Sequence, residues 1–171
     1  MIARTDAIRL LEEQHAEVAS LLAELDEAAF VRRGTIGGGE WSAKDLAAHL
    51  GSWEGFAIET LENVQRGERP PIDDELTGPG SDDRLNAREV KRFLDAPASD
   101  VMSRFEDLHR RIVGSIEATT DERWATPYPF DPEEDSLGDR IGGLLGSEAG
   151  GFTHARAHLP DLRAYVNSTR R

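Results

Sequence analysis

Apolar residues recur at spacings of three and four along most of the chain, which is the pattern of helices that bury one face. Charged residues fill the positions between them. No internal repeat is present, and no segment alternates apolar and polar residues in the way that predicts a strand. The pattern therefore predicts an all-α protein. The four expected helices cover about residues 6–28, 42–66, 84–119 and 136–166.

The start of the second helix is the most clearly marked boundary. In the stretch GGGEWSAKDLAAHL, Ser42 is placed to cap the helix, and Asp45 follows three residues later as in a capping box. Gly67 is expected to end this helix. Further along, Pro97 predicts a break in the third helix, because proline removes a backbone donor.

The connection between the second and third helices, residues 68–83, is rich in proline, glycine and acidic residues and predicts a long loop. A segment of this length reaches ~50 Å when extended, which exceeds the ~37 Å of a helix of about 25 residues. It can therefore return along the second helix, so that the third helix starts parallel to the second. Four helices with one long crossover predict a four-helix bundle.

Length and composition limit the number of domains and the expected location of the protein. A length of 171 residues fits one domain, predicted to span residues 1–171. No apolar run approaches the ~20 residues of a membrane span, and the N-terminal residues have no signal-peptide core. The chain has no cysteine, so disulfides and thiolate metal sites are excluded. The expected location is the cytoplasm.

The net charge indicates which partners the protein is expected to avoid. At −13, the protein is expected to repel phosphate backbones and anionic membranes. We therefore predict no nucleic-acid partner and no membrane partner, and expect a small-molecule substrate instead.

Three of the five histidines form a candidate metal site. His154 and His158 are four residues apart, which places both imidazoles on one face of a helix. His49 lies two turns into the second helix and completes a three-nitrogen set if the second and fourth helices are neighbours. Three neutral imidazoles suit Zn²⁺, Ni²⁺, Fe²⁺ or Cu²⁺ and leave positions open for water or substrate. The alternative is a solvated polar face shared with Arg156 and Asp161.

Two stretches carry a resemblance to a known family, namely GGGEWSAKDLAAHLGSWE at 37–54 and THARAHLPDLRAYV at 153–166. The chain resembles the DinB/YfiT-like four-helix bundles, which include mycothiol-dependent maleylpyruvate isomerase and thiol S-transferases. The resemblance implies an up-down-down-up course. It also implies that His49, His154 and His158 are the metal ligands, with Zn²⁺ or Ni²⁺ as the expected ion. Because members of this family often pair, a homodimer is a further expectation.

Other residues are candidates for the surroundings of the site, or for structure alone. His15 and His109 lie on or beside apolar helix faces and are interpreted as structural. Six residues are candidates for lining the pocket or for orienting the imidazoles. They are Asp45, Trp53, Ser147, Gly150, Gly151 and Asp161.

Three functions are in competition. The leading prediction is a metal-dependent enzyme that transfers a low-molecular-weight thiol, mycothiol or bacillithiol, to a small electrophile or hydrolyses one. No residue is assigned as its catalytic acid or base. The alternative is a resistance-type bundle that sequesters a small molecule without converting it. A third hypothesis is an interaction module whose acidic loops bind a basic partner. Turnover that depends on metal separates the first from the second.

Overall fold

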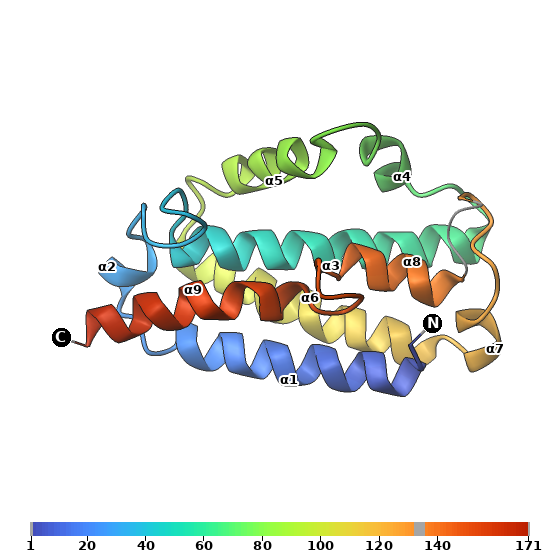
Figure 1. Ribbon diagram of the computed structural model, residues 1–171, viewed down its shortest axis with the longest axis horizontal. Coiled ribbons are helices and arrows are strands. Elements are labelled where there is room, and N and C mark those ends of the chain that lie inside the picture. Colours follow the sequence, from blue (N-terminus) through green and yellow to red (C-terminus); the bar gives the residue numbers. More distant parts are fainter. Residues whose placement is uncertain (1, 132–135, 171) are drawn as a thin grey trace.

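Long helices packed side by side make up the protein, shown in Figure 1 as a computed structural model. The structure describes residues 2–131 and 136–170, and no strand forms within these ranges. The helices of the described residues are α1 (Arg4–Leu22), α2 (Glu27–Phe30), α3 (Ala43–Arg66), α4 (Pro71–Glu75), α5 (Ser81–Arg92), α6 (Ala98–Ala118), α7 (Asp121–Trp124), α8 (Leu137–Leu144) and α9 (His154–Thr169).

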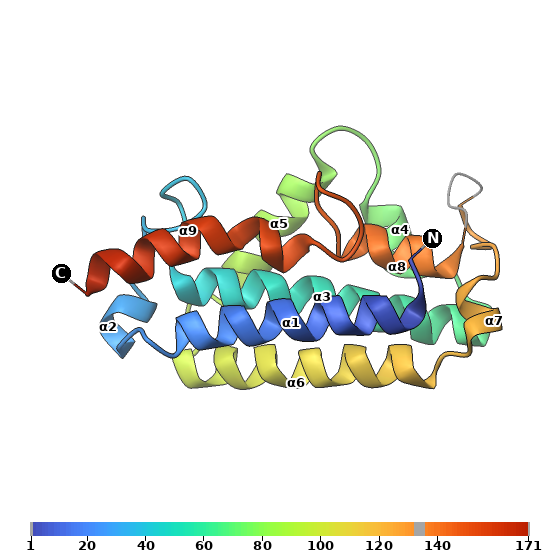
Figure 2. The ribbon, with the colours of Figure 1, turned by 60° about the horizontal axis from the view of Figure 1, so that its bottom comes forward.

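Four rows of helix form the bundle. Helices α1, α3 and α6 supply one row each, and α8 with α9 supplies the fourth (Figures 1 and 2). The rows run up, down, down and up, because α3 and α6 point the same way while α1 and α8–α9 point the other way. The predicted all-α class and bundle course are confirmed.

The core lies between these rows and accounts for most of their stability. Leu46 of α3, Ile112 of α6 and Leu162 of α9 are fully buried. Each such side chain contributes about 1.5–3 kcal/mol when it leaves water. The helices are thus held mainly by their shared apolar faces, as expected for amphipathic segments.

The ends of α3 follow the sequence signals. The Ser42 side chain accepts a hydrogen bond from the backbone of Asp45, and the Asp45 carboxylate accepts one from the backbone of Ser42. This reciprocal capping box satisfies two backbone donors at the helix start. Gly67 closes the helix in a left-handed conformation, which glycine adopts at little cost.

The crossover contains more structure than its composition predicts. The expected loop at 68–83 contains α4. The expected third helix at 84–119 is broken before Pro97 as predicted, but its first part is α5, which lies over α3 as an additional layer, so that only α6 belongs to the bundle (Figure 1). The crossover from α3 to α6 therefore carries both α4 and α5.

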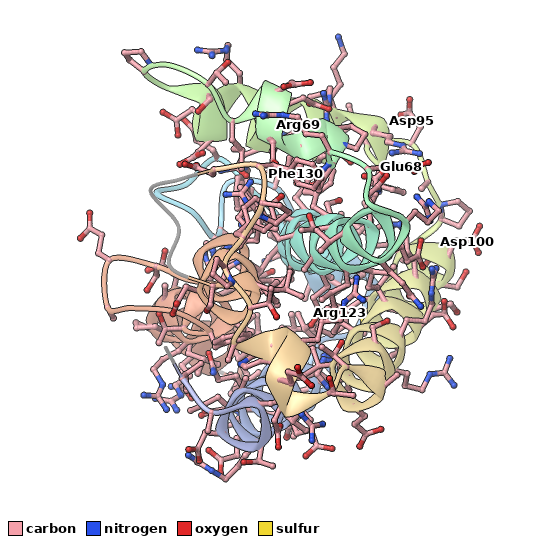
Figure 3. The ribbon with its side chains drawn as sticks, turned by 90° about the vertical axis from the view of Figure 1, so that its right-hand side faces the viewer. Glu68, Arg69, Asp95, Asp100, Arg123 and Phe130 are labelled. Atoms are coloured by element: carbon pink, nitrogen blue, oxygen red, sulfur yellow. The ribbon has the colours of Figure 1, made fainter. Side chains whose placement is uncertain are left out.

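Leu85 and Val90 anchor α5 because they bury their side chains. Viewed from the end of the bundle, the same layer sits above α3, with Arg69 beside Phe130 (Figure 3). There the Arg69 guanidinium donates to the Phe130 carbonyl at 3.2 Å.

The fourth row is interrupted where a continuous helix over 136–166 was expected. α8 ends at Leu144, and α9 begins only at His154. Between them Gly150 and Phe152 have positive φ angles of 121° and 59°, which a helix does not allow. The apolar periodicity continues through this segment because Phe152 is buried, and for that reason the pattern alone misses the break. Among the described residues, no helix is long and apolar enough to cross a membrane.

Candidate metal centre

Three histidines from two helices converge inside the bundle. His49 lies on α3, and His154 and His158 lie on the first turns of α9. One nitrogen from each ring lies within 4.8 Å of the others, and His49 Nε2 is 2.8 Å from His154 Nε2. The structure thus brings together all three of the residues expected to ligate a metal.

The break before α9 sets the position of two of these rings. His154 is the first residue of α9, and its backbone N–H donates to the carbonyl of Leu145 at 3.0 Å. Gln14 of α1 holds the same segment, because its amide donates to the Phe152 carbonyl and accepts from the Arg156 N–H, at 2.8 and 2.9 Å. His158 then follows one turn later on the same face.

The surroundings favour neutral imidazoles. Burial lowers the pKa of His49 well below its usual value, and the nearby charges of His154 and His158 lower it further. Burial, with His158 as a second cause, lowers the pKa of His154 to about 3. Burial also lowers the pKa of His158, against an opposing effect of Asp161. Because a neutral imidazole keeps a free lone pair, the set has the protonation that metal binding requires.

The donor set fits a transition-metal ion. It offers three imidazole nitrogens, and the chain has no thiolate to compete with them. The Nδ1 atom of His49 is buried without a hydrogen-bond partner among the described residues, so Nε2 alone ties this ring to a polar neighbour, His154. An ion on Nε2 would restrain the ring further.

Two indole rings flank the histidines. The ring of Trp41 lies 4.8 Å from that of His49 and 6.2 Å from that of His158, measured between centroids. The ring of Trp53 lies edge-on to His154 at 5.8 Å, and its Nε1 donates to Asn86 of α5 at 2.9 Å. Trp53 thus forms a wall of the site and also joins it to the crossover.

The two carboxylate candidates differ in their positions. Asp45 is buried in the capping box of α3, and this structural role accounts for it. Asp161 lies on α9 one turn beyond His158 and raises the pKa of that ring through its charge. Asp161 therefore acts on the site electrostatically.

Ser147, Gly150 and Gly151 belong to the tight turn that connects α8 and α9. The Ser147 hydroxyl forms a hydrogen bond with that of Thr153 at 2.7 Å, and Ser147 pairs with Gly150 through its backbone. A Cβ at Gly151 would lie 3.3 Å from the backbone of Gly142. Gly151 thus permits close packing of the turn on α8, and Gly150 adopts a positive φ of 121° that favours glycine. Ser147, Gly150 and Gly151 also line an open pocket on this side of the bundle, and their role beside the histidines stays a prediction.

Sequence reasoning missed a second polar group in the same bundle. His15 of α1 and His109 of α6 are stacked with centroids 3.6 Å apart, and they bond to Glu106 and Glu54, respectively. Burial raises the pKa of Glu54 and lowers that of His15. The only signal in the sequence was the three-residue spacing of Glu106 and His109, which helical bundles use for metal binding.

Fold and site together define a class of protein, a bundle with an up-down-down-up course and three histidines gathered near its core. The chain belongs to the DinB superfamily, whose sequence profile matches residues 10–148. The matched region includes His49 and ends before His154 and His158. No curated protein matches the chain significantly.

Two crystal structures share the fold. An uncharacterised protein from Escherichia coli UTI89 is similar with a TM-score of 0.82 and 13% identity, over 99% of this chain and 96% of that chain. The colibactin self-resistance protein ClbS, in complex with double-stranded DNA, is similar with a TM-score of 0.77 and 12% identity, over 100% of this chain and 98% of that chain. At these identities the likeness shows the fold alone.

The likeness to ClbS corrects the main functional prediction. The prediction of an enzyme that transfers a thiol or hydrolyses an electrophile is contradicted, because ClbS, which has this fold, is a self-resistance protein. The physical reason is that a fold and a set of potential ligands do not by themselves bring about turnover. Asp45 and Ser147, both expected near the site, are held in structural hydrogen bonds.

The exclusion of nucleic acid is also overturned, because ClbS has this fold and is bound to double-stranded DNA. Net charge is a sum over the whole surface, whereas a duplex meets only one face of a protein. In this acidic chain the arginines are unevenly spread. Arg92, Arg104 and Arg111 lie at one hollow between α3, α5 and α6, which also holds Glu59, Glu62 and Glu89. A net charge of −13 was therefore not a sufficient argument.

Proposed function

We propose that the protein binds a small molecule at the three-histidine group and holds it without converting it, as a resistance-type protein would. One observation carries the proposal. His49, His154 and His158 bring their donor nitrogens within 4.8 Å of one another beside two tryptophan rings. The shared fold of ClbS, a self-resistance protein, supports the same conclusion.

In this proposal Zn²⁺ or Ni²⁺ is the bound ion, and the three imidazoles are its ligands. Such an ion supplies an open coordination position for a donor atom of the small molecule. The protein's own contribution is to keep the rings neutral by burial and to fix their direction. The break before α9 and the clamp by Gln14 provide that direction.

The shape of the site defines how the ligand approaches. The small cavity beside His154 measures about 20 Å³, which holds roughly one water molecule. A drug-sized compound therefore has to reach the site from solvent, past the half-buried rings of His158 and Trp41. We infer a ligand with a metal-binding group and a flat apolar or cationic part that lies against an indole.

The test is a thermal-shift screen of zinc-loaded protein against cytotoxic small molecules that carry a metal-binding group. A ligand present at 100 times its Kd stabilises the folded state by about 2.7 kcal/mol. For a chain of this size, the midpoint should rise by roughly 5–10 °C. Mass spectrometry of the recovered compound should show the starting mass, since the proposal requires binding without conversion.

His154→Ala is the loss variant, and Asp107→Asn, on the exposed face of α6, is the matched control. The shift should disappear in the first and persist in the second. A shift that survives His154→Ala would place the ligand elsewhere. Steady consumption of the compound would show an enzyme and refute the proposal.

A further inference from the structure

A second group of ionisable side chains lies inside the bundle, on α1, α3 and α6. His15 Nε2 lies 3.1 Å from Glu106 Oε2, and His109 Nδ1 lies 3.0 Å from Glu54 Oε1. His15, Glu54 and His109 are largely buried, with side chains 10%, 11% and 10% exposed. Two imidazoles and a carboxylate are thus held away from solvent on three different helices.

The donor atoms of this group converge. One atom each from His15, Glu54 and His109 lies within 4.8 Å of the others, a limit that the three-histidine group also meets. Two buried atoms of the group, His15 Nδ1 and Glu54 Oε2, have no hydrogen-bond partner. A polar atom is rarely left in this state by packing alone, because burial without a partner is unfavourable.

There is space beside two residues of this group. The cavity of about 20 Å³ near His154 is also lined by His15 and Glu54, and its other walls are mainly apolar. This volume accepts one water molecule or one ion, and not an organic ligand.

We propose that His15, Glu54 and His109 form a second site for a divalent transition-metal ion such as Zn²⁺, separate from the three-histidine group. Two imidazoles with one carboxylate are an established donor set for zinc. Glu106 accepts the Nε2 proton of His15, which leaves Nδ1 free to ligate and fixes the ring. The spacing of Glu106 and His109, three residues apart on α6, matches the pattern of metal sites in helical bundles.

Ion binding has a structural consequence in this group. The rings of His15 and His109 are parallel to within 6°, whereas an imidazole ligates in its own plane. The two rings therefore have to open for both to face one ion. The ion would also replace the proton between His109 Nδ1 and Glu54 Oε1, which now holds those two atoms together.

The triple variant His49→Asn/His154→Asn/His158→Asn isolates this site. It leaves His15 and His109 as the only histidines of the chain, so imidazole NMR signals belong to them alone. The variant is offered Zn²⁺, desalted and assayed by elemental mass spectrometry, with its fold checked by circular dichroism. We expect about one ion per chain, and both imidazole signals should shift as the stack opens.

Adding Glu54→Gln should abolish this ion, whereas Glu106→Gln should weaken its affinity by roughly 10–100-fold. A folded triple variant without zinc, or with unmoved imidazole signals, would overturn the second site. If the triple variant does not fold, His154→Asn alone serves: zinc should then fall from two ions per chain to one, and a fall from one to zero refutes the proposal. That last outcome would still support the three-histidine site.

Discussion

The ring of His154 stands at the start of α9 among two other imidazoles and the indole of Trp53. Its pKa of about 3 lies below the 6.5 that the ring has in the unfolded chain. Between these values the unfolded chain binds a proton that the folded chain does not. The free energy of unfolding therefore falls as the pH drops from 6.5 towards 3, by at most about 1.4 kcal/mol per pH unit for this ring.

This linkage is measurable in metal-free protein. Urea unfolding with a chelator present, at pH 7.5 and pH 5.0, should show a loss of stability at the lower pH. In His154→Gln, where the titrating ring is absent, that loss should shrink by up to about 2 kcal/mol. The difference between the two proteins is the test, because other groups titrate in both. Equal losses would show that His154 titrates normally in the folded state.

For single residues, the sequence predicts the positions that local rules determine. The cap at Ser42 fixes the register of α3 and therefore the side on which His49 lies, and the spacing of His154 and His158 puts them on one face. The partnership of His15 with His109 was not predictable in this way. It depends on how α1 packs against α6, which neither helix encodes alone.

Helix α8 illustrates what glycine does at the scale of an element. A Cβ at Gly138 would lie 2.5 Å from Nε1 of Trp124, and one at Gly142 would lie 3.0 Å from the ring of Phe152. Both aromatic side chains are fully buried, and Trp124 Nε1 donates to the carbonyl of Ile2. The missing side chains thus allow two large rings to lie against the backbone of α8.

Gly138→Ala and Gly114→Ala should therefore have opposite effects. Nothing lies within 4 Å of a Cβ at Gly114 on α6, so alanine there should stabilise the protein by about 0.5–1 kcal/mol. At Gly138 the overlap with Trp124 should cost about 1–3 kcal/mol instead. Urea midpoints of both variants against the wild type decide the point. Stabilisation by both would mean that Trp124 moves aside without cost.

The prediction of a continuous helix over 136–166 was wrong, because Phe152 packs on Gly142 from a turn. Periodicity counts Leu145 and Phe152 as one apolar stripe, and they are indeed both buried. However, Phe152 reaches the core from a turn with positive φ that packs on Gly142, and not from a helix. The low helix propensity of Gly146, Gly150 and Gly151 agrees with the break, but apolar periodicity does not register it.

For the whole molecule, the crossover forms a separate layer on one side of the bundle (Figure 1). Few apolar side chains attach the crossover to the bundle, and polar contacts supply much of the remaining stabilisation. Asp73 of α4 accepts from Tyr128 at 2.7 Å and from Arg140 at 2.6 Å, and Asn86 accepts from Trp53. That the entire chain of residues 1–171 is one domain stays a prediction, as does the homodimer.

A layer held in this way should open before the bundle unfolds, because elements with few buried apolar contacts have low local stability. In hydrogen exchange, the amides of α5 should lose protection sooner than those of α3 and α6. Asp73→Asn should widen this difference in protection, since it removes the charge that pairs with Arg140 in a buried setting, where a broken pair costs about 3–5 kcal/mol.

Glu62→Gln, at an exposed ion pair with Arg111, is the control and should leave exchange in α5 unchanged. Equal protection of α5 and α3 in the wild type would show instead that crossover and bundle unfold as one unit. Because Trp53 joins α5 to the histidines, an opening layer would also release the Trp53 Nε1 from Asn86 beside the site.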